Sequence, residues 1–173
     1  MRILFWALAL LLTFVAQTTA YHLFPWAPVL PDLALALALS GGLRWGAGGG
    51  LRFGAAAGLL QDLLLSGTLG FGLFSKAMTG FTVGWLRERY LTDWALSRAI
   101  MTAAATLADL MIFNALIKGL YGLEYSDNLM ALALWRIPVN IIAVLALLPL
   151  LETADKKLAA RSAWRGEETP AFE

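Results

Sequence analysis

The sequence predicts an all-α membrane protein, a polytopic bundle of about six transmembrane helices with both chain ends in the cytoplasm. Three observations support this prediction: the composition, the spacing of glycines in the middle of the chain, and the one-sided distribution of basic residues. Of the 173 residues, 60% are hydrophobic and 14% are charged, whereas a soluble domain carries about 25% charged residues. We therefore expect one integral membrane domain over residues 1–151 and a charged, partly disordered cytoplasmic tail over residues 152–173.

The composition also excludes several classes of function. A net charge of +1 gives no basic field that would attract nucleic acid. The chain has no cysteine and one histidine, which excludes disulfides, thiolate metal sites and metal clusters built from several histidines. There is no Gly-x-Ser-x-Gly motif, and Asp62 and Asp109 are expected at different depths, which argues against an aspartyl pair that shares a proton. We therefore expect no enzyme, no cofactor and no metal.

Apolar runs and the residues that flank them divide the chain into six expected helices. The first run ends at Thr18-Thr19-Ala20, which also fits a signal-peptide cleavage site, but we expect a retained helix. The second run alternates Ala and Leu and would also suit a strand, but a lone strand cannot satisfy its backbone in lipid. The expected ranges are Ile3–Thr19, Asp32–Leu43, Phe53–Leu65, Gly70–Leu86, Ala99–Lys118 and Leu129–Leu151, the last kinked at Pro138.

The expected connections differ in composition. Tyr21–Pro31 holds prolines and aromatic residues, which favour a loop at the membrane interface, and Asp32 is a good N-cap for the following helix. The glycine-rich segment Arg44–Arg52 lacks the Gly-Lys-Ser/Thr ending of a phosphate-binding loop, so we expect a flexible turn. The other expected connections are a tight Ser66-Gly67 turn, a charged loop over Arg87–Arg98 and an acidic loop over Gly119–Asn128, and disorder is expected over Gly166–Glu173.

Basic residues gather in connections that alternating helices would place on one side of the membrane. With a cytoplasmic N-terminus, that side receives Arg2, Arg44, Arg52, Arg87, Arg89, Arg98 and the tail cations Lys156, Lys157, Arg161 and Arg165. The opposite side receives only Lys118. Because cytoplasmic loops of membrane proteins carry an excess of Lys and Arg, we expect both termini in the cytoplasm.

Glycines recur every fourth residue on two neighbouring expected helices. The first series is Gly50, Gly54 and Gly58, continued by Asp62, and the second is Gly72, Lys76, Gly80 and Gly84. Residues four apart share one side of a helix, and small residues there let helices approach closely in lipid. We therefore expect these glycines to pack the third and fourth helices together.

Ionisable residues inside the expected helices predict a buried polar centre, formed by Gln61, Asp62, Lys76, Asp109, Arg136 and Asn140. At about 1.5 Å per residue, depth makes two ion pairs plausible, Lys76 with Asp109 and Asp62 with Arg136. A pair between Asp62 and Lys76 is the main alternative, because a lysine stem reaches about one turn along a helix. The centre has either a structural role or a role in recognising a partner or ligand.

The chain resembles a known family, the rod shape-determining proteins of the MreD type. The resemblance covers nearly the whole chain and is most specific between Gly58 and Gly84. The residues that carry it are the run Gly54-x-x-x-Gly58-Leu-Leu-Gln61-Asp62, then Leu69-Gly70, Lys76, Gly80 and Gly84-Trp85-Leu86, with Pro31-Asp32, Asn140 and Pro149-Leu150 outside this core.

The resemblance implies a multi-pass, non-enzymatic scaffold of the elongation complex in the bacterial inner membrane, which supports cell shape and lateral peptidoglycan synthesis. The partner that it implies first is MreC, with RodA, a penicillin-binding transpeptidase and MreB in the same machinery. The family is also similar in fold to the substrate-binding subunits of energy-coupling-factor transporters, whose docking motif resembles Ala16-x-x-x-Ala20. The alternative function is therefore a substrate-binding subunit for a vitamin-type small molecule.

Overall fold

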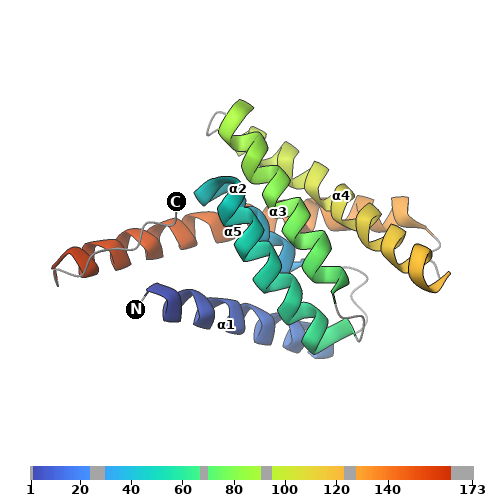
Figure 1. Cartoon of the computed structure of the whole chain (residues 1–173), viewed down its shortest axis with the longest axis horizontal. Coiled ribbons are helices and arrows are strands. Elements are labelled where there is room, and N and C mark those ends of the chain that lie inside the picture. Colours follow the sequence, from blue (N-terminus) through green and yellow to red (C-terminus); the bar gives the residue numbers. More distant parts are fainter. Residues whose placement is uncertain (1, 24–29, 67–69, 91–94, 123–127, 165–173) are drawn as a thin grey trace.

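The computed structural model describes residues 2–23, 30–66, 70–90, 95–122 and 128–164, and this part of the chain contains helices and no strand. Within these residues, five α-helices follow one another (Figure 1), and a π-helical turn joins the end of the second of them. They are α1 (Arg2–Leu23), α2 (Leu33–Gln61), the π-helical turn η1 (Asp62–Ser66), α3 (Phe71–Tyr90), α4 (Ala95–Tyr121) and α5 (Leu129–Trp164). The prediction of an all-helical fold is confirmed.

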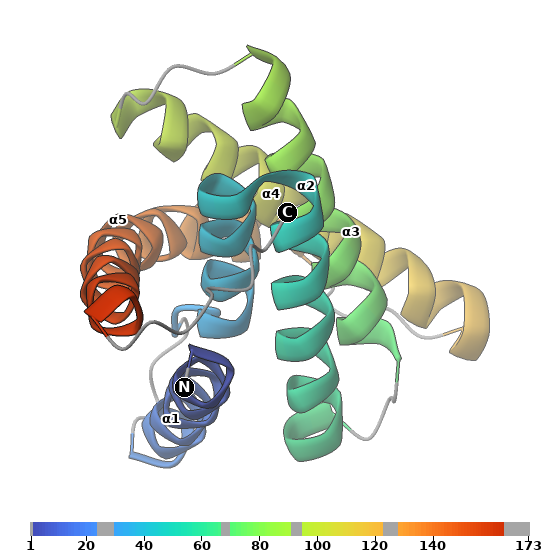
Figure 2. The same ribbon diagram turned by 60° about the vertical axis from the view of Figure 1, so that its left-hand side comes forward.

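Helix α2 consists of two arms, residues 33–44 and 47–61, which lie side by side in Figure 2. The chain reverses at Trp45 and Gly46, the two residues with non-helical backbone angles, and Gly46 has a φ of 71°. Positive φ is a conformation that glycine adopts without steric cost. The expected flexible loop over Arg44–Arg52 is therefore wrong in extent, because the reversal takes two residues and the helix resumes at Ala47.

Most other expected helices are longer in the structure than in the prediction. Helix α1 continues to Leu23, α3 ends at Tyr90 and α4 spans Ala95–Tyr121, so the charged loop and the acidic loop are both shorter than expected. Helix α5 continues through the start of the expected tail to Trp164. Its Lys, Glu and Ala residues there are good helix formers, so the helix does not need an apolar environment to persist.

Some expectations concern residues outside the described part of the chain. They include the tight Ser66-Gly67 turn, whose second residue is not described, and the disorder over Gly166–Glu173. The predicted N-cap is present, since the Asp32 carboxylate accepts a hydrogen bond of 2.9 Å from the backbone N–H of Leu35. Both Pro138 and Pro149 lie inside α5, and the kink at Pro138 stays a prediction.

The apolar core joins all five helices in two clusters. In one, Phe14 of α1 packs with Ala34, Leu37 and Ala57 from the two arms of α2. In the other, Leu35, Leu39, Val83, Met101, Val144 and Leu148 connect α2, α3, α4 and α5. Helix α1 is thus an integral part of the bundle rather than an appendage.

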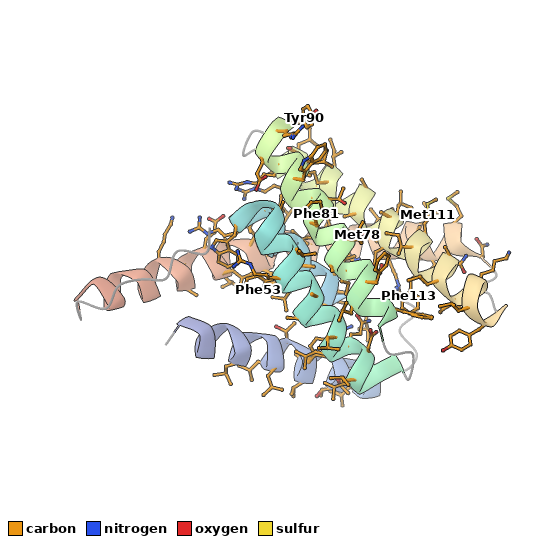
Figure 3. The ribbon with its side chains drawn as sticks, in the orientation of Figure 1. Phe53, Met78, Phe81, Tyr90, Met111 and Phe113 are labelled. Carbon is orange, nitrogen blue, oxygen red and sulfur yellow. The ribbon has the colours of Figure 1, made fainter. Side chains whose placement is uncertain are left out.

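The outer surface of the bundle is rich in large apolar side chains, while its interior holds polar ones. Figure 3 shows Met78 and Phe81 on α3 and Met111 on α4. The exposed fractions of these side chains are 43%, 39% and 65%. By length and composition, Ala95–Tyr121 and Met130–Ala154 qualify as membrane-spanning helices. This arrangement suits a lipid environment, in which apolar side chains face outward and polar groups must find partners inside.

Candidate functional site

The second arm of α2 and helix α3 lie backbone against backbone along the two glycine series. A Cβ atom on Gly54 would overlap the carbonyl oxygen of Lys76, and one on Gly58 would overlap that of Gly72. A Cβ on Gly80 would likewise overlap the carbonyl oxygen of Gly50. These positions have no room for any side chain, so the approach of the two helices depends on glycine.

The same interface extends to both ends of α3. A Cβ on Gly84 would overlap the backbone of Gly46 at the chain reversal, and one on Gly72 would overlap the carboxylate of Asp62. The structure therefore brings the singled-out glycines of the two series into one continuous contact.

Lys76 lies at the centre of a buried charge network. Its side chain is 2% exposed, and its ammonium nitrogen lies 3.0 Å from Asp32 Oδ2 and 3.5 Å from Asp109 Oδ2. The hydroxyl of Ser75 donates a hydrogen bond to Asp109 Oδ1. The structure thus places Lys76 beside Asp109, as depth indicated, and adds a second carboxylate to the pair.

Asn140 of α5 connects this network to a fourth element. Its side-chain oxygen accepts a hydrogen bond of 2.9 Å from the backbone N–H of Asp32, and its amide group donates one of 3.3 Å to the hydroxyl of Thr106 on α4. The network therefore joins α2, α3, α4 and α5 through side chains that are all buried. Unsatisfied polar groups are costly inside a membrane protein. These connected hydrogen bonds and ion pairs therefore favour one packing of the four helices over others.

Asp62 binds the beginning of α3. Its Oδ2 atom accepts hydrogen bonds from the backbone N–H groups of Gly70 and Leu73, at 2.8 and 3.0 Å, and its Oδ1 atom accepts one from Gly72 at 2.9 Å. The first N–H groups of a helix have no partner within the helix, and the helix dipole also stabilises a carboxylate placed there. Asp62 therefore caps α3, and its expected ion pair with Arg136 stays a prediction.

Gln61 and Arg136 lie at a small polar cavity beside the network. The cavity has a volume of about 30 Å³ and is lined by Asp32, Gln61, Lys76, Asp109, Arg136, Leu110 and Phe113. We call it the polar cavity. Two acidic and two basic side chains border it, so their formal charges cancel.

Asp32 is the main member of the network that sequence reasoning missed as a site residue. The sequence indicated it as an N-cap and as part of the family resemblance, and not as a member of the polar centre. The first arm of α2 has 12 residues by its numbering, about 18 Å at ~1.5 Å per residue, which is short of a ~30 Å hydrocarbon layer. That shortness was the available signal that Asp32 lies inside the bundle.

A second cavity, of about 360 Å³, lies between α3 and α4 and has mainly apolar walls, including Met78, Val83, Ile100 and Met101. The hydroxyls of Thr79 and Thr82 also line it, but each donates to the carbonyl oxygen four residues earlier, Ser75 and Met78. This second cavity therefore lacks the convergent polar groups that fix a small polar ligand.

Within the described residues, no three side chains of His, Cys, Asp or Glu come together as a metal site would require. A sequence model of the family described as "rod shape-determining protein MreD" matches residues 1–157 of the chain. No curated protein and no solved structure matches it.

Proposed function

The chain belongs to the MreD family of rod shape-determining membrane proteins, and from this premise we propose that it is a non-enzymatic scaffold of the bacterial elongation complex. In this role it would hold MreC and, through the complex, the peptidoglycan synthase RodA and its transpeptidase partner at the inner membrane. The observation that carries the proposal is the family match, which extends over residues 1–157.

The polar network supports a scaffold because its charged groups are used to hold helices together. Lys76 pairs with both Asp32 and Asp109, and Asn140 and Thr106 satisfy the neighbouring polar groups. Buried networks of this kind add rigidity when every member is satisfied. A rigid bundle presents a constant outer surface, which is what a subunit that positions other membrane proteins requires.

The transporter alternative receives less support from the cavities. A site for a drug-sized ligand occupies about 300–1,000 Å³ and combines apolar walls with a few convergent polar groups. The polar cavity, at about 30 Å³, has the charges without the volume. The cavity between α3 and α4, at about 360 Å³, has the volume without free polar groups.

Affinity purification from native membranes tests the proposal. The chain, tagged at Glu173, is extracted in mild detergent from a strain in which it replaces the chromosomal copy, and co-purifying proteins are identified by mass spectrometry. We expect MreC to be recovered in amounts comparable to the chain, and depletion of the chain to turn rod-shaped cells round. A matched control is a tagged, unrelated multi-pass protein of the same abundance.

Two outcomes would contradict the scaffold. Recovery of a transport ATPase and its membrane partner in place of MreC would favour the transporter alternative. Normal rod shape after complete depletion, with MreC still assembled with RodA, would show that the complex does not need this chain.

A further inference from the structure

We propose that the polar cavity is a binding site for an ordered water molecule that links Gln61 to the charge network. The cavity lies where the end of α2 approaches α4 and α5, and Gln61 contributes from α2, Asp109 from α4 and Arg136 from α5. Its volume of about 30 Å³ exceeds the ~10–15 Å³ that one water requires when measured in this way.

Gln61 supplies the observation that points to a ligand. Its side-chain oxygen is buried and receives no hydrogen bond within the part of the chain that the structure describes. An unsatisfied buried acceptor costs about 1–3 kcal/mol in proteins, so native structures normally provide a partner, often ordered water. A water in the adjoining cavity would donate a hydrogen bond to this oxygen.

The other walls offer the remaining partners. A buried water usually makes two to four hydrogen bonds. The carboxylates of Asp32 and Asp109 accept hydrogen bonds, and the cationic groups of Lys76 and Arg136 donate them, and all four residues line the cavity. Leu110 and Phe113 form the apolar part of the lining. Donors and acceptors are thus both present, which suits water better than an anion or a cation alone.

Such a water would add a link between Gln61 and the charge network. Asp62, the residue after Gln61, caps α3, whereas Lys76, Asp109 and Asn140 form the central network. A bridge from Gln61 would connect the capped end of the α2–α3 pair to that network. This inference does not depend on the proposed function.

Radiolytic footprinting of the full-length chain in lipid nanodiscs tests the site. Brief X-ray exposure makes hydroxyl radicals from bound water, and these oxidise side chains beside it. Leu110, 3% exposed, lines the cavity, whereas Leu35, 1% exposed, lies in the apolar core and is the internal control. We expect Leu110 to be oxidised well above Leu35, and the Gln61→Leu substitution to lower Leu110 oxidation to the level of Leu35.

A density map of the wild-type chain at a resolution that reveals ordered water is the second measurement, and it stands even if Gln61→Leu does not fold. The expected result is a solvent peak within hydrogen-bonding distance of Gln61 Oε1. Two results would overturn the proposal: equal oxidation of Leu110 and Leu35 in the wild type, or a map in which the Gln61 amide contacts Arg136 directly without a solvent peak while other ordered waters are visible.

Discussion

Carboxylates at the starts of three helical segments show how single residues organise the bundle. Asp32 caps the first arm of α2, Glu88 accepts a hydrogen bond of 2.8 Å from the N–H of Ala47 at the start of the second arm, and Asp62 caps α3. Two of these caps come from another segment of the chain rather than from the residue before the helix. Each cap therefore fixes a helix start and a tertiary contact at the same time.

Replacing Asp62 tests its capping role. Asp62→Ala removes the acceptor of three backbone N–H groups, and because a lost cap costs up to roughly 2 kcal/mol, we expect a clear fall in the thermal midpoint in detergent. Asp62→Asn, which keeps one acceptor oxygen, should lose less. Asn128→Ala is the matched control, since the Asn128 side chain accepts an exposed hydrogen bond from the backbone N–H of Ala131 at the start of α5. Its effect should be smaller than that of Asp62→Ala.

The double substitution Asp62→Asn with Arg136→Gln distinguishes capping from charge neutralisation. If Asp62 acts mainly as a cap, removing the arginine charge does not restore the lost acceptor, so we expect no recovery of stability. Full recovery in the double variant would instead support the ion pair that depth alone predicted. A double-mutant comparison of thermal midpoints measures this coupling.

Lys76 gives a second prediction at the residue scale. Lys76→Met leaves Asp32 and Asp109 buried near one another without their cation, and breaking a buried ion pair typically costs about 3–5 kcal/mol. We expect little folded protein by size-exclusion chromatography. Adding Asp109→Asn brings the formal charges around the polar cavity back to zero, because Asp32 and Arg136 remain, and should restore much of the yield. An unchanged thermal midpoint in Lys76→Met alone would refute the structural role of the network.

The sequence predicted part of the buried polar centre, because depth in the membrane can be estimated by counting residues only along a regular helix. Lys76 and Asp109 lie on long helices, for which counting residues gives a usable depth, and the two groups meet. Counting residues did not place Asp32 in the centre, because the first arm of α2 begins inside the bundle. It did not reveal the capping role of Asp62 either, because Asp62 begins a π-helical turn that no sequence periodicity indicates. Side-chain positions on long helices can therefore be predicted from the sequence, whereas those at irregular helix ends cannot.

At the scale of elements, the pair formed by α2 and α3 depends on glycine for two different reasons. Along the interface, Gly54, Gly58 and Gly80 leave no space for a Cβ atom. At the reversal, Gly46 combines a positive φ with contact to Glu88. The spacing of four residues predicted the close packing of the two helices. It did not predict the reversal at Gly46, because the glycine-rich run around it also suited a flexible loop.

Gly58→Ala tests the interface with the smallest available change. The added methyl group would overlap the backbone of Gly72 and Leu73, and because overpacking costs typically about 1–3 kcal/mol, we expect a lower thermal midpoint and less monodisperse protein. Gly119→Ala is the matched control, since a Cβ there meets nothing within 4 Å and alanine is the better helix former. Equal behaviour of the two variants would show that α2 and α3 separate without cost.

At the scale of the whole molecule, one end of the bundle gathers aromatic and basic side chains. This end holds the reversal of α2 and the C-terminal end of α3, which meet through Ala47 and Glu88. Aromatic and basic side chains gather there: Trp45 stacks on Phe53 with ring centroids 4.9 Å apart, and Arg89 lies 4.6 Å from the ring of Trp85. Such residues are enriched at membrane interfaces, and basic ones on the cytoplasmic side.

The aromatic and basic side chains at this end, together with the cation distribution along the sequence, predict that six segments cross or enter the membrane with both termini in the cytoplasm. These segments are α1, the two arms of α2, α3, α4 and α5. Alkaline phosphatase folds only after export, so a fusion after Glu173 should be inactive. A fusion at Gly122, an exposed residue at the end of α4, should be active, because α4 then carries the chain to the opposite side. A fluorescent protein that matures in the cytoplasm gives the reciprocal readout at both positions. Activity after Glu173 would require the chain to export most of its loop cations against the charge bias, and would therefore invert the assignment of the two ends.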